Sequence, residues 1–216
     1  WAARLLPYVE QDAVWRQATD AARVQSFPFT VGTPHPLATV IRVYGCPADG
    51  RVREVALARG QLPVALGSYL GVAGTRNARG DGSLYRDSKV KFTDITDGTS
   101  NTLLVGERPP APDFWVGWWY AGWGVDQLGT ADTVLGASER ATPANSELPN
   151  CGRGPSRFRP GRLDGLCDVM HFWSLHPGGA NFLFADGGVR FLRYDAADIL
   201  PALATRAGGE PVSPPE

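Results

Sequence analysis

The stretch ANFLFADGGVRFLR, residues 180–193, decides the fold class, because it holds the strongest hairpin signal in the chain. Two apolar runs flank Asp186-Gly187, a dipeptide that suits the positive φ angles of a tight hairpin turn. We therefore predict two antiparallel strands that pair across this turn.

Upstream of the hairpin, further runs of apolar and β-branched residues predict more strands. The clearest are SYLGVAGT at 68–75 and TLLVGE at 102–107, and weaker β signals lie at 38–47, 89–95 and 114–124. Helix is expected only over residues 1–24, where Pro7 suits a first turn, and near residues 196–203. The sequence predicts a single α+β domain over residues 1–208 with a mainly antiparallel sheet, a loop-rich excursion at about 125–168 and a disordered tail at 209–216.

Composition and charge argue against a nucleic-acid-binding protein and against a membrane-spanning chain. The 216 residues are 43% apolar and 20% charged, with 26 Gly and 18 Pro, which is typical of a soluble domain with many turns. The net charge of −1 gives no overall field that would recruit nucleic acid or an anionic membrane. No apolar run approaches the roughly 20 residues that span a bilayer.

The cysteines indicate the redox compartment. Cys151 and Cys167 bracket the loop GRGPSRFRPGRLDGL, which has few means of ordering itself. We expect a disulfide between them, with two unrelated buried thiols as the alternative, and a disulfide implies an oxidising compartment. Zinc is not expected at this pair, because no second close Cys/His pair accompanies it. Cys46 is left over.

The sequence holds little catalytic chemistry. His171 and His176 are five residues apart, which does not align them on one helix face. They could form a metal pair or supply a general base, but we interpret them as histidines that hydrogen-bond a loop. Ser100, His176 and Asp186 lack the G-x-S-x-G context of a hydrolase nucleophile. Nucleotide-binding glycine motifs are also absent from the sequence, so no enzyme is predicted.

Oxygen-bearing side chains concentrate in FTDITDGTSN at 92–101. Asp94 and Asp97 are weak candidates for calcium ligands, but the spacing is not that of an EF-hand loop. The same residues form turns by bonding their own backbone, which is the interpretation we favour.

Aromatic and basic clusters suggest two surfaces. Trp115, Trp118, Trp119 and Trp123 could stack against a glycan or a partner if exposed; we favour core packing, in which Trp118 and Trp119 face opposite sides. The arginines of the excursion (Arg153, Arg157, Arg159 and Arg162) could bind anions, and we interpret them as a solvated loop.

Several segments in order resemble a known bacterial family. They are LLPYVEQ at 5–11, YGCPADG at 44–50, SYLGVAGT at 68–75, FTDITDGTSNTLLVGE at 92–107 and HPGGANFLFADGGVRFL at 176–192. In the last, nine residues separate His176 from Asp186-Gly187. This is similar to the prepilin-like proteins with a C-terminal His-x9-Asp-Gly signature, a family of unknown function sometimes labelled solute-binding-like.

The resemblance implies a pilin-like head whose long hydrophobic N-terminal helix would precede Trp1 and anchor the precursor. It also implies a periplasmic or cell-surface location, and partners among pilin-like subunits or secretion machinery. Family members commonly carry a cysteine just after that helix, which could pair with Cys46. Modification of Cys46 by a thiol reagent in the full-length, non-reduced protein would exclude this pairing.

Residues that match the family motifs are expected to be structural. They are His176, Asp186, Gly187, Asp97, Gly98, Asn101 and Glu107. The resemblance and the aromatic cluster lead to two candidate functions. The chain is either a non-catalytic structural subunit of a pilin-like or pseudopilin-like envelope protein, or an extracellular binding module that uses residues 114–124. Neither involves nucleic acid, and membrane contact would come only through the preceding helix.

Overall fold

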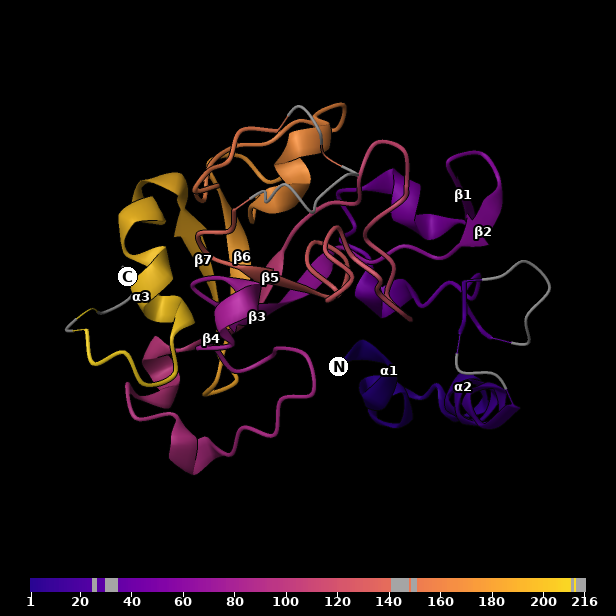
Figure 1. The fold of residues 1–216 in the computed structure, drawn as a ribbon, viewed down its shortest axis with the longest axis horizontal. Coiled ribbons are helices and arrows are strands. Elements are labelled where there is room, and N and C mark those ends of the chain that lie inside the picture. The colour runs from indigo at the N-terminus through magenta and orange to yellow at the C-terminus, as the bar shows by residue number, and fades with distance from the viewer. Residues whose placement is uncertain (25–26, 30–34, 141–147, 149–150, 211, 213–216) are drawn as a thin grey trace.

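A computed structural model gives the chain an α+β fold and describes residues 1–24, 27–29, 35–140, 148, 151–210 and 212 (Figure 1). The described α-helices are α1 (Ala2–Leu5), α2 (Asp12–Val24) and α3 (Leu200–Ala204). The described strands are β1 (Ala56–Ala58), β2 (Leu62–Val64), β3 (Tyr69–Gly74), β4 (Leu103–Glu107), β5 (Val134–Gly136), β6 (Gly179–Phe184) and β7 (Val189–Arg193). Short 3-10 turns connect many of them.

The main sheet has five strands in the order β5-β3-β4-β6-β7, and β1 and β2 form a separate two-stranded ribbon. Within the main sheet all pairs are antiparallel except β3 with β5. The register places Leu70 opposite Gly106, and Gly106 opposite Phe182. The predicted strands at 68–75 and 102–107 and the hairpin at 180–193 are therefore confirmed.

One face of the main sheet carries the largest hydrophobic core. Leu70, Leu103 and Phe182 point into it, together with Leu200 and Leu203 of α3. In Figure 1 α3 lies beside β6 and β7, whereas α1 and α2 lie on the far side of the molecule from it. The sheet thus separates the C-terminal helix from the N-terminal helices.

Two smaller cores adjoin the sheet. One lies under the β1–β2 ribbon and contains Trp118 with Leu66 and Val64. The other lies under α1 and contains Trp119 with Leu6 and Tyr44. The prediction that Trp118 and Trp119 pack inward on opposite sides is confirmed.

Three β predictions were wrong. Residues 38–47 contain a 3-10 turn at Arg42–Tyr44, and residues 89–95 contain another at Phe92–Asp94. In the first segment Ile41 and Tyr44 are buried in a core from an irregular backbone, whereas the second segment runs across the surface with mostly exposed side chains. Over 114–124 the described backbone makes a single bridge, from Trp118 to Leu66. The buried aromatic side chains of this segment pack into the hydrophobic cores from a backbone that does not form a strand.

The N-terminal helical prediction was right in kind but not in continuity. A 3-10 turn at Leu6–Val9 contains Pro7, and Glu10 adopts a left-handed φ of 60° before α2 begins. Near the C-terminus, the helix expected at 196–203 is a 3-10 turn at Tyr194–Asp198 followed by α3. None of the helices described has both the length and the apolar character needed to cross a bilayer.

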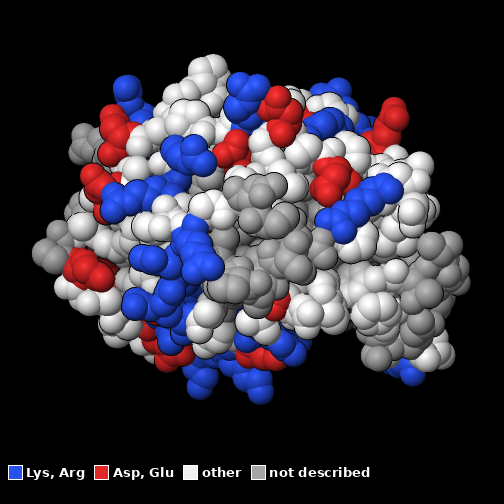
Figure 2. Space-filling view, turned by 45° about the horizontal axis from the view of Figure 1, so that its top comes forward, with Lys and Arg blue, Asp and Glu red and all other residues white. Residues whose placement is uncertain are grey.

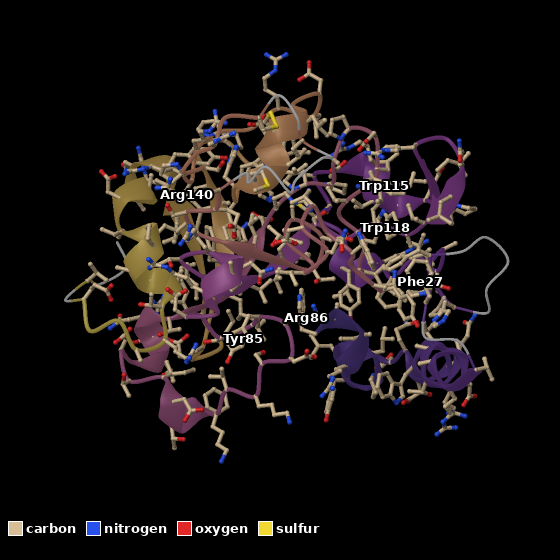
Figure 3. All side chains as sticks on the ribbon, viewed as in Figure 1. Phe27, Tyr85, Arg86, Trp115, Trp118 and Arg140 are labelled. Carbon is tan, nitrogen blue, oxygen red and sulfur yellow. A yellow bond between two sulfur atoms is a disulfide. The ribbon has the colours of Figure 1, made fainter. Side chains whose placement is uncertain are left out.

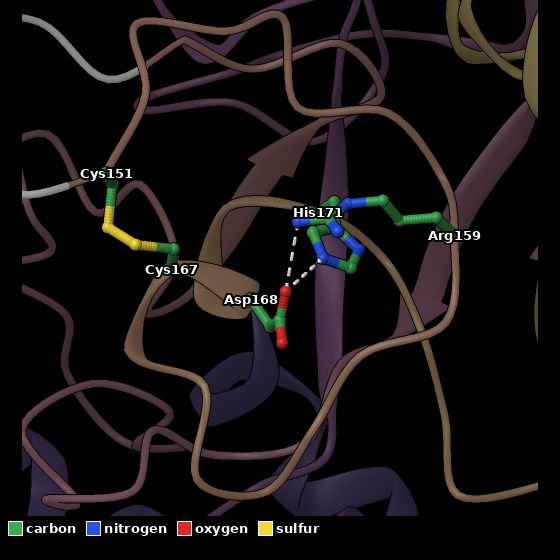
Figure 4. The surroundings of a disulfide bond; sticks show 5 residues. All are labelled: Cys151, Arg159, Cys167, Asp168 and His171. Carbon is green, nitrogen blue, oxygen red and sulfur yellow. Dashed lines mark hydrogen bonds and ion pairs between the residues drawn. A yellow bond between two sulfur atoms is a disulfide. The ribbon is translucent and has the colours of Figure 1, made fainter.

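The described residues of the excursion at 125–168 are mostly irregular, as predicted, but they also supply β5, which the sequence did not predict. The disulfide between Cys151 and Cys167 is confirmed, with the two Cα atoms 5.3 Å apart (Figure 4). Of the tail expected at 209–216, residues 211 and 213–216 lie outside the described part of the chain. Gly209, the first residue of that tail, is bound to the domain, because its N–H donates to Asp97 Oδ1 at 2.9 Å.

Candidate functional site

His176 of the His-x9-Asp-Gly signature lies beside two residues from distant parts of the chain. Its Nε2 is 3.5 Å from Cys46 Sγ and 3.4 Å from Glu107 Oε1. The three ligand-type atoms all lie within 4.8 Å of one another, and within the described ranges no other group of three His, Cys, Asp or Glu residues meets the same test. Cys46 and Glu107 are buried, whereas the His176 side chain is 34% exposed.

Strand pairing or a backbone hydrogen bond positions each member of this Cys46–Glu107–His176 cluster. Glu107 is the last residue of β4, and it pairs with Tyr69 at the start of β3. His176 lies in the loop before β6, where its N–H donates to Ser174 Oγ at 3.0 Å. Cys46 follows the 3-10 turn at Arg42–Tyr44, and its N–H donates to Ser68 Oγ at 3.0 Å.

Burial and neighbouring charge disfavour ionisation in the cluster. Burial raises the pKa of the Cys46 thiol, the N–H of Ala48 lowers it, and the Glu107 carboxylate raises it again. The pKa of Tyr69 is raised to about 12, mainly by burial, with further contributions from Cys46 and Glu107. The thiol by itself is therefore not an activated nucleophile.

The geometry also differs from that of a catalytic triad. In a triad the acid holds the ring nitrogen opposite the one that faces the nucleophile. Here Glu107 and Cys46 both face Nε2 of His176. His176 does not approach Asp186, which lies at the other end of β6 and bonds Arg190. The Ser100–His176–Asp186 combination considered from the sequence is thus not assembled.

His171 and His176 do not form a pair around a common ligand. His171 is buried near the disulfide, with Nε2 2.9 Å from Asp168 Oδ1 and Nδ1 3.1 Å from the Phe172 carbonyl oxygen (Figure 4). Arg159 binds the same Asp168 oxygen at 3.1 Å. Burial lowers the pKa of His171, and the bond to Asp168 opposes this. His171 thus holds Asp168, whose carboxylate also binds Arg159 and accepts the Arg162 N–H within the disulfide loop.

The other signature residues build two turns that touch each other. Gly187 has a φ of 86° and Gly98 a φ of 94°, values that suit glycine. The side chain of Asn101 donates to the Asp97 carbonyl oxygen at 3.2 Å. Asp186 N donates to the carbonyl oxygen of Thr99 at 3.0 Å, which joins the two turns.

The carboxylates of both calcium candidates accept hydrogen bonds from backbone N–H groups, and that of Asp97 also accepts from the Thr205 hydroxyl at 3.3 Å. The carboxylate of Asp94 accepts the N–H of Lys91 at 2.8 Å in an exposed turn. The carboxylate of Asp97 accepts from Gly208 N at 2.7 Å and from Gly209 N at 2.9 Å. Both side chains serve as acceptors for the backbone.

The face of the main sheet opposite α3 forms the floor of an apolar groove of about 840 Å³. Its floor includes Val105 and Leu183, and its wall includes Trp1 and Leu5 of the N-terminal segment. Glu107 lies at its edge, which connects the groove to the Cys46–Glu107–His176 cluster. Val189, which also lines the groove, is 66% exposed, and Phe191 on the same strand is 43% exposed. This face is therefore partly uncovered.

The tryptophan segment offers little exposed aromatic surface. Trp118 and Trp119 are 3% and 4% exposed. Trp115 packs edge-to-face against Trp118, and the Arg59 guanidinium lies 4.4 Å from the centroid of the Trp115 ring (Figure 3). Trp123 alone of these four tryptophans is largely exposed, at 45%.

The arginines of the excursion are mostly paired. Arg157 lies 2.5 Å from Asp198, Arg159 lies 3.1 Å from Asp168, and Arg162 lies 2.9 Å from Asp164. Figure 2 shows Lys and Arg side chains next to Asp and Glu side chains over much of this face, with one group of adjoining basic side chains left of its centre.

The sequence identifies His176 and Glu107 as motif residues, but it does not predict that Cys46 lies next to them. Cys46 and His176 are 130 residues apart, and no local spacing signals their contact. The one available signal was the leftover cysteine in YGCPADG, whose segment also belongs to the resemblance.

Comparison with known proteins gives one match. No curated protein and no solved structure matches the chain. One family model, described as a protein of unknown function (DUF1559), matches residues 1–198. Because this match spans most of the 216 residues, the chain belongs to the DUF1559 family.

Proposed function

We propose that this chain is the globular head of a pilin-like or pseudopilin-like envelope protein and acts as a non-catalytic structural subunit. The observation that supports this most is the apolar groove along the sheet face opposite α3. In the proposed protein, the C-terminal half of a hydrophobic helix preceding Trp1 lies in this groove, against Val105 and Leu183. Burial of these side chains by the helix would stabilise the joined structure.

The shape of the groove suits a helix. Its volume of about 840 Å³ is lined by large aliphatic and aromatic side chains from two sides, the sheet and the N-terminal segment. A helix entering there would continue directly into α1, since Trp1 forms part of the groove wall. The disulfide between Cys151 and Cys167 fits a periplasmic or cell-surface location.

The alternative, a binding module that stacks a glycan on residues 114–124, has less support. Trp118 and Trp119 belong to cores, and Arg59 covers one face of Trp115. A stacking platform would depend on Trp123, and one ring is a small surface for sugar recognition. Assembly with other pilin-like subunits or with secretion machinery is the partner class that we favour.

The encoded residues immediately before Trp1 provide the first test. We expect a short basic leader followed by about 20 apolar residues, enough for an anchoring helix. A second test places a photo-crosslinking amino acid at Leu183 in the longer protein, with Asp164 as an exposed control position in the disulfide loop, outside the groove lining. Crosslinks from position 183 to the preceding helix, but not from position 164, are expected. A groove position that crosslinks only to other segments would contradict the proposal.

A further inference from the structure

We propose that Cys46, Glu107 and His176 form a binding site for a divalent metal ion of the zinc class. The site rests on the geometry of the described side chains and does not depend on the pilin-like function. A structural metal is compatible with a non-catalytic head. If the loaded protein instead showed metal-dependent hydrolysis, the site would stand and the non-catalytic part of the proposed function would fall.

Two of the three distances between the ligand atoms match the edges of a metal tetrahedron, and the third pair, Cys46 Sγ and the Glu107 carboxylate, lies within 4.8 Å. With bonds of about 2.3 Å to sulfur, 2.0 Å to nitrogen and 2.1 Å to oxygen, tetrahedral zinc separates sulfur from nitrogen by about 3.5 Å and nitrogen from oxygen by about 3.4 Å. The observed separations are 3.5 Å between Cys46 Sγ and His176 Nε2 and 3.4 Å between His176 Nε2 and Glu107 Oε1. The latter is longer than a well-formed N–H···O hydrogen bond.

Hydrogen bonds around the cluster orient each ligand. Glu107 Oε2 accepts from the backbone N–H of Asn181 at 2.6 Å and from its side-chain amide at 3.1 Å, which leaves Oε1 facing His176. The backbone N–H of Ala48 lowers the pKa of the Cys46 thiol and so opposes the effect of burial, which favours the thiolate that a metal needs. Ser174 holds the His176 loop by accepting the His176 N–H and donating to the Gly179 carbonyl oxygen at 2.8 Å. Such outer contacts are typical of built metal sites.

The donor set selects the metal. Thiolate, imidazole and carboxylate together favour zinc over calcium or magnesium, which prefer oxygen ligands. On binding, the Cys46 thiol releases its proton to solvent and the sulfur bonds the ion. Three protein ligands leave the fourth position to a water molecule, which can enter from the exposed His176 side. The ion would join β4 to the loops that hold Cys46 and His176.

Cobalt substitution tests the site on the oxidised protein. The chain has three cysteines, and two of them form the disulfide, so any thiolate-to-cobalt charge-transfer band must come from Cys46. We expect one Co²⁺ per chain, ligand-field bands of tetrahedral cobalt, and displacement by Zn²⁺. Cys46→Ser should abolish the charge-transfer band. Glu107→Gln and His176→Gln should each weaken Zn²⁺ binding by at least about 10-fold.

Asp186→Asn is the matched control. It removes a carboxylate from the same signature at the opposite end of β6 while keeping an oxygen that can accept the Gly188 N–H. We expect unchanged metal binding in this variant. Loss of binding equal to that of Glu107→Gln would overturn the assignment.

A second measurement needs no variant. Zn²⁺ should slow alkylation of Cys46 in the wild-type oxidised chain by at least about 10-fold, because the ligated sulfur is not free to react. Absence of both protection and the charge-transfer band would overturn the site and leave a hydrogen-bonded cluster. A disulfide from Cys46 to another cysteine of the longer protein, found by mass spectrometry without reduction, would also overturn it.

Discussion

Asp97 fastens the segment after α3 to the turn before β4. Its carboxylate accepts the N–H groups of Gly208 and Gly209 and the hydroxyl of Thr205, while the Arg206 carbonyl oxygen accepts the N–H of Thr96. From the sequence Asp97 was interpreted as a turn residue or a weak calcium ligand. Its contacts with residues more than 100 positions away could not be predicted from its local pattern.

Replacing Asp97 tests this role. We expect Asp97→Ala to lower the free energy of unfolding by about 1–3 kcal/mol, because it leaves the two glycine N–H groups without their acceptor. Asp94→Ala is the control, since Asp94 is exposed and its carboxylate accepts the N–H of Lys91 within its own turn. Urea denaturation measures both. Equal losses in the two variants would contradict a specific role for Asp97.

His171 makes stability depend on pH. Burial lowers its pKa from the ordinary 6.5, so the folded state binds this proton less readily than the unfolded state. Stability from this group is therefore complete above about pH 6.5 and is lost as pH falls toward the lowered pKa. We expect the difference in unfolding free energy between wild type and His171→Gln to be largest at pH 8 and smaller at pH 5. A difference that stays constant over this range would contradict the assignment.

At the scale of elements, β4 depends on the glycine that precedes its last residue, Gly106. A Cβ at Gly106 would lie 2.5 Å from Cε1 of Phe182 and 2.7 Å from Cδ1 of Phe172, closer than real contacts allow. We expect Gly106→Ala to destabilise the protein by about 1–3 kcal/mol through overpacking. Gly50→Ala is the control, because no atom lies within 4 Å of its Cβ position. Thermal unfolding of the two variants should differ clearly, and similar midpoints would contradict this account.

The disulfide orders the loop between its two cysteines. Removing it in Cys151→Ser/Cys167→Ser should lower the free energy of unfolding by about 3 kcal/mol, the chain-entropy value for a closed loop of about 15 residues. Reductant should destabilise the wild type by a similar amount and leave the double variant unchanged. A double variant that still responds to reductant would show that another bond is involved.

Prediction from sequence succeeded for elements whose signals are local. The turn at Asp186-Gly187 fixes β6 against β7, so neighbouring residues contain the required information. Prediction from sequence failed at 38–47 and 114–124. There, apolar side chains fill cores from an irregular backbone, and an irregular backbone leaves no periodic pattern in the sequence. It missed β5, whose parallel pairing with β3 joins segments more than 50 residues apart and is decided by tertiary packing. The Cys46–Glu107–His176 cluster was missed for the same reason.

At the scale of the whole molecule, the aromatic side chains decide stability. Trp119 is 4% exposed and packs under α1, where its Nε1 donates to the Thr39 carbonyl oxygen at 2.7 Å. We expect Trp119→Ala to cost about 3–5 kcal/mol, as buried tryptophan truncations do. Trp123→Ala, at a largely exposed position, should cost much less. Denaturant midpoints measure both effects, and a larger loss from Trp123→Ala would contradict the core assignment.

Trp118 and Trp119 are consecutive residues whose indoles enter different cores, one under the β1–β2 ribbon and one under α1. The peptide bond between them makes it hard for either core to open while the other stays closed, because withdrawing one ring rotates the backbone that carries its neighbour. The amide protons of the ribbon and of the N-terminal region should therefore exchange with deuterium at a common rate set by one shared opening event. A mutation on one side of this dipeptide would then accelerate exchange on the other side as well.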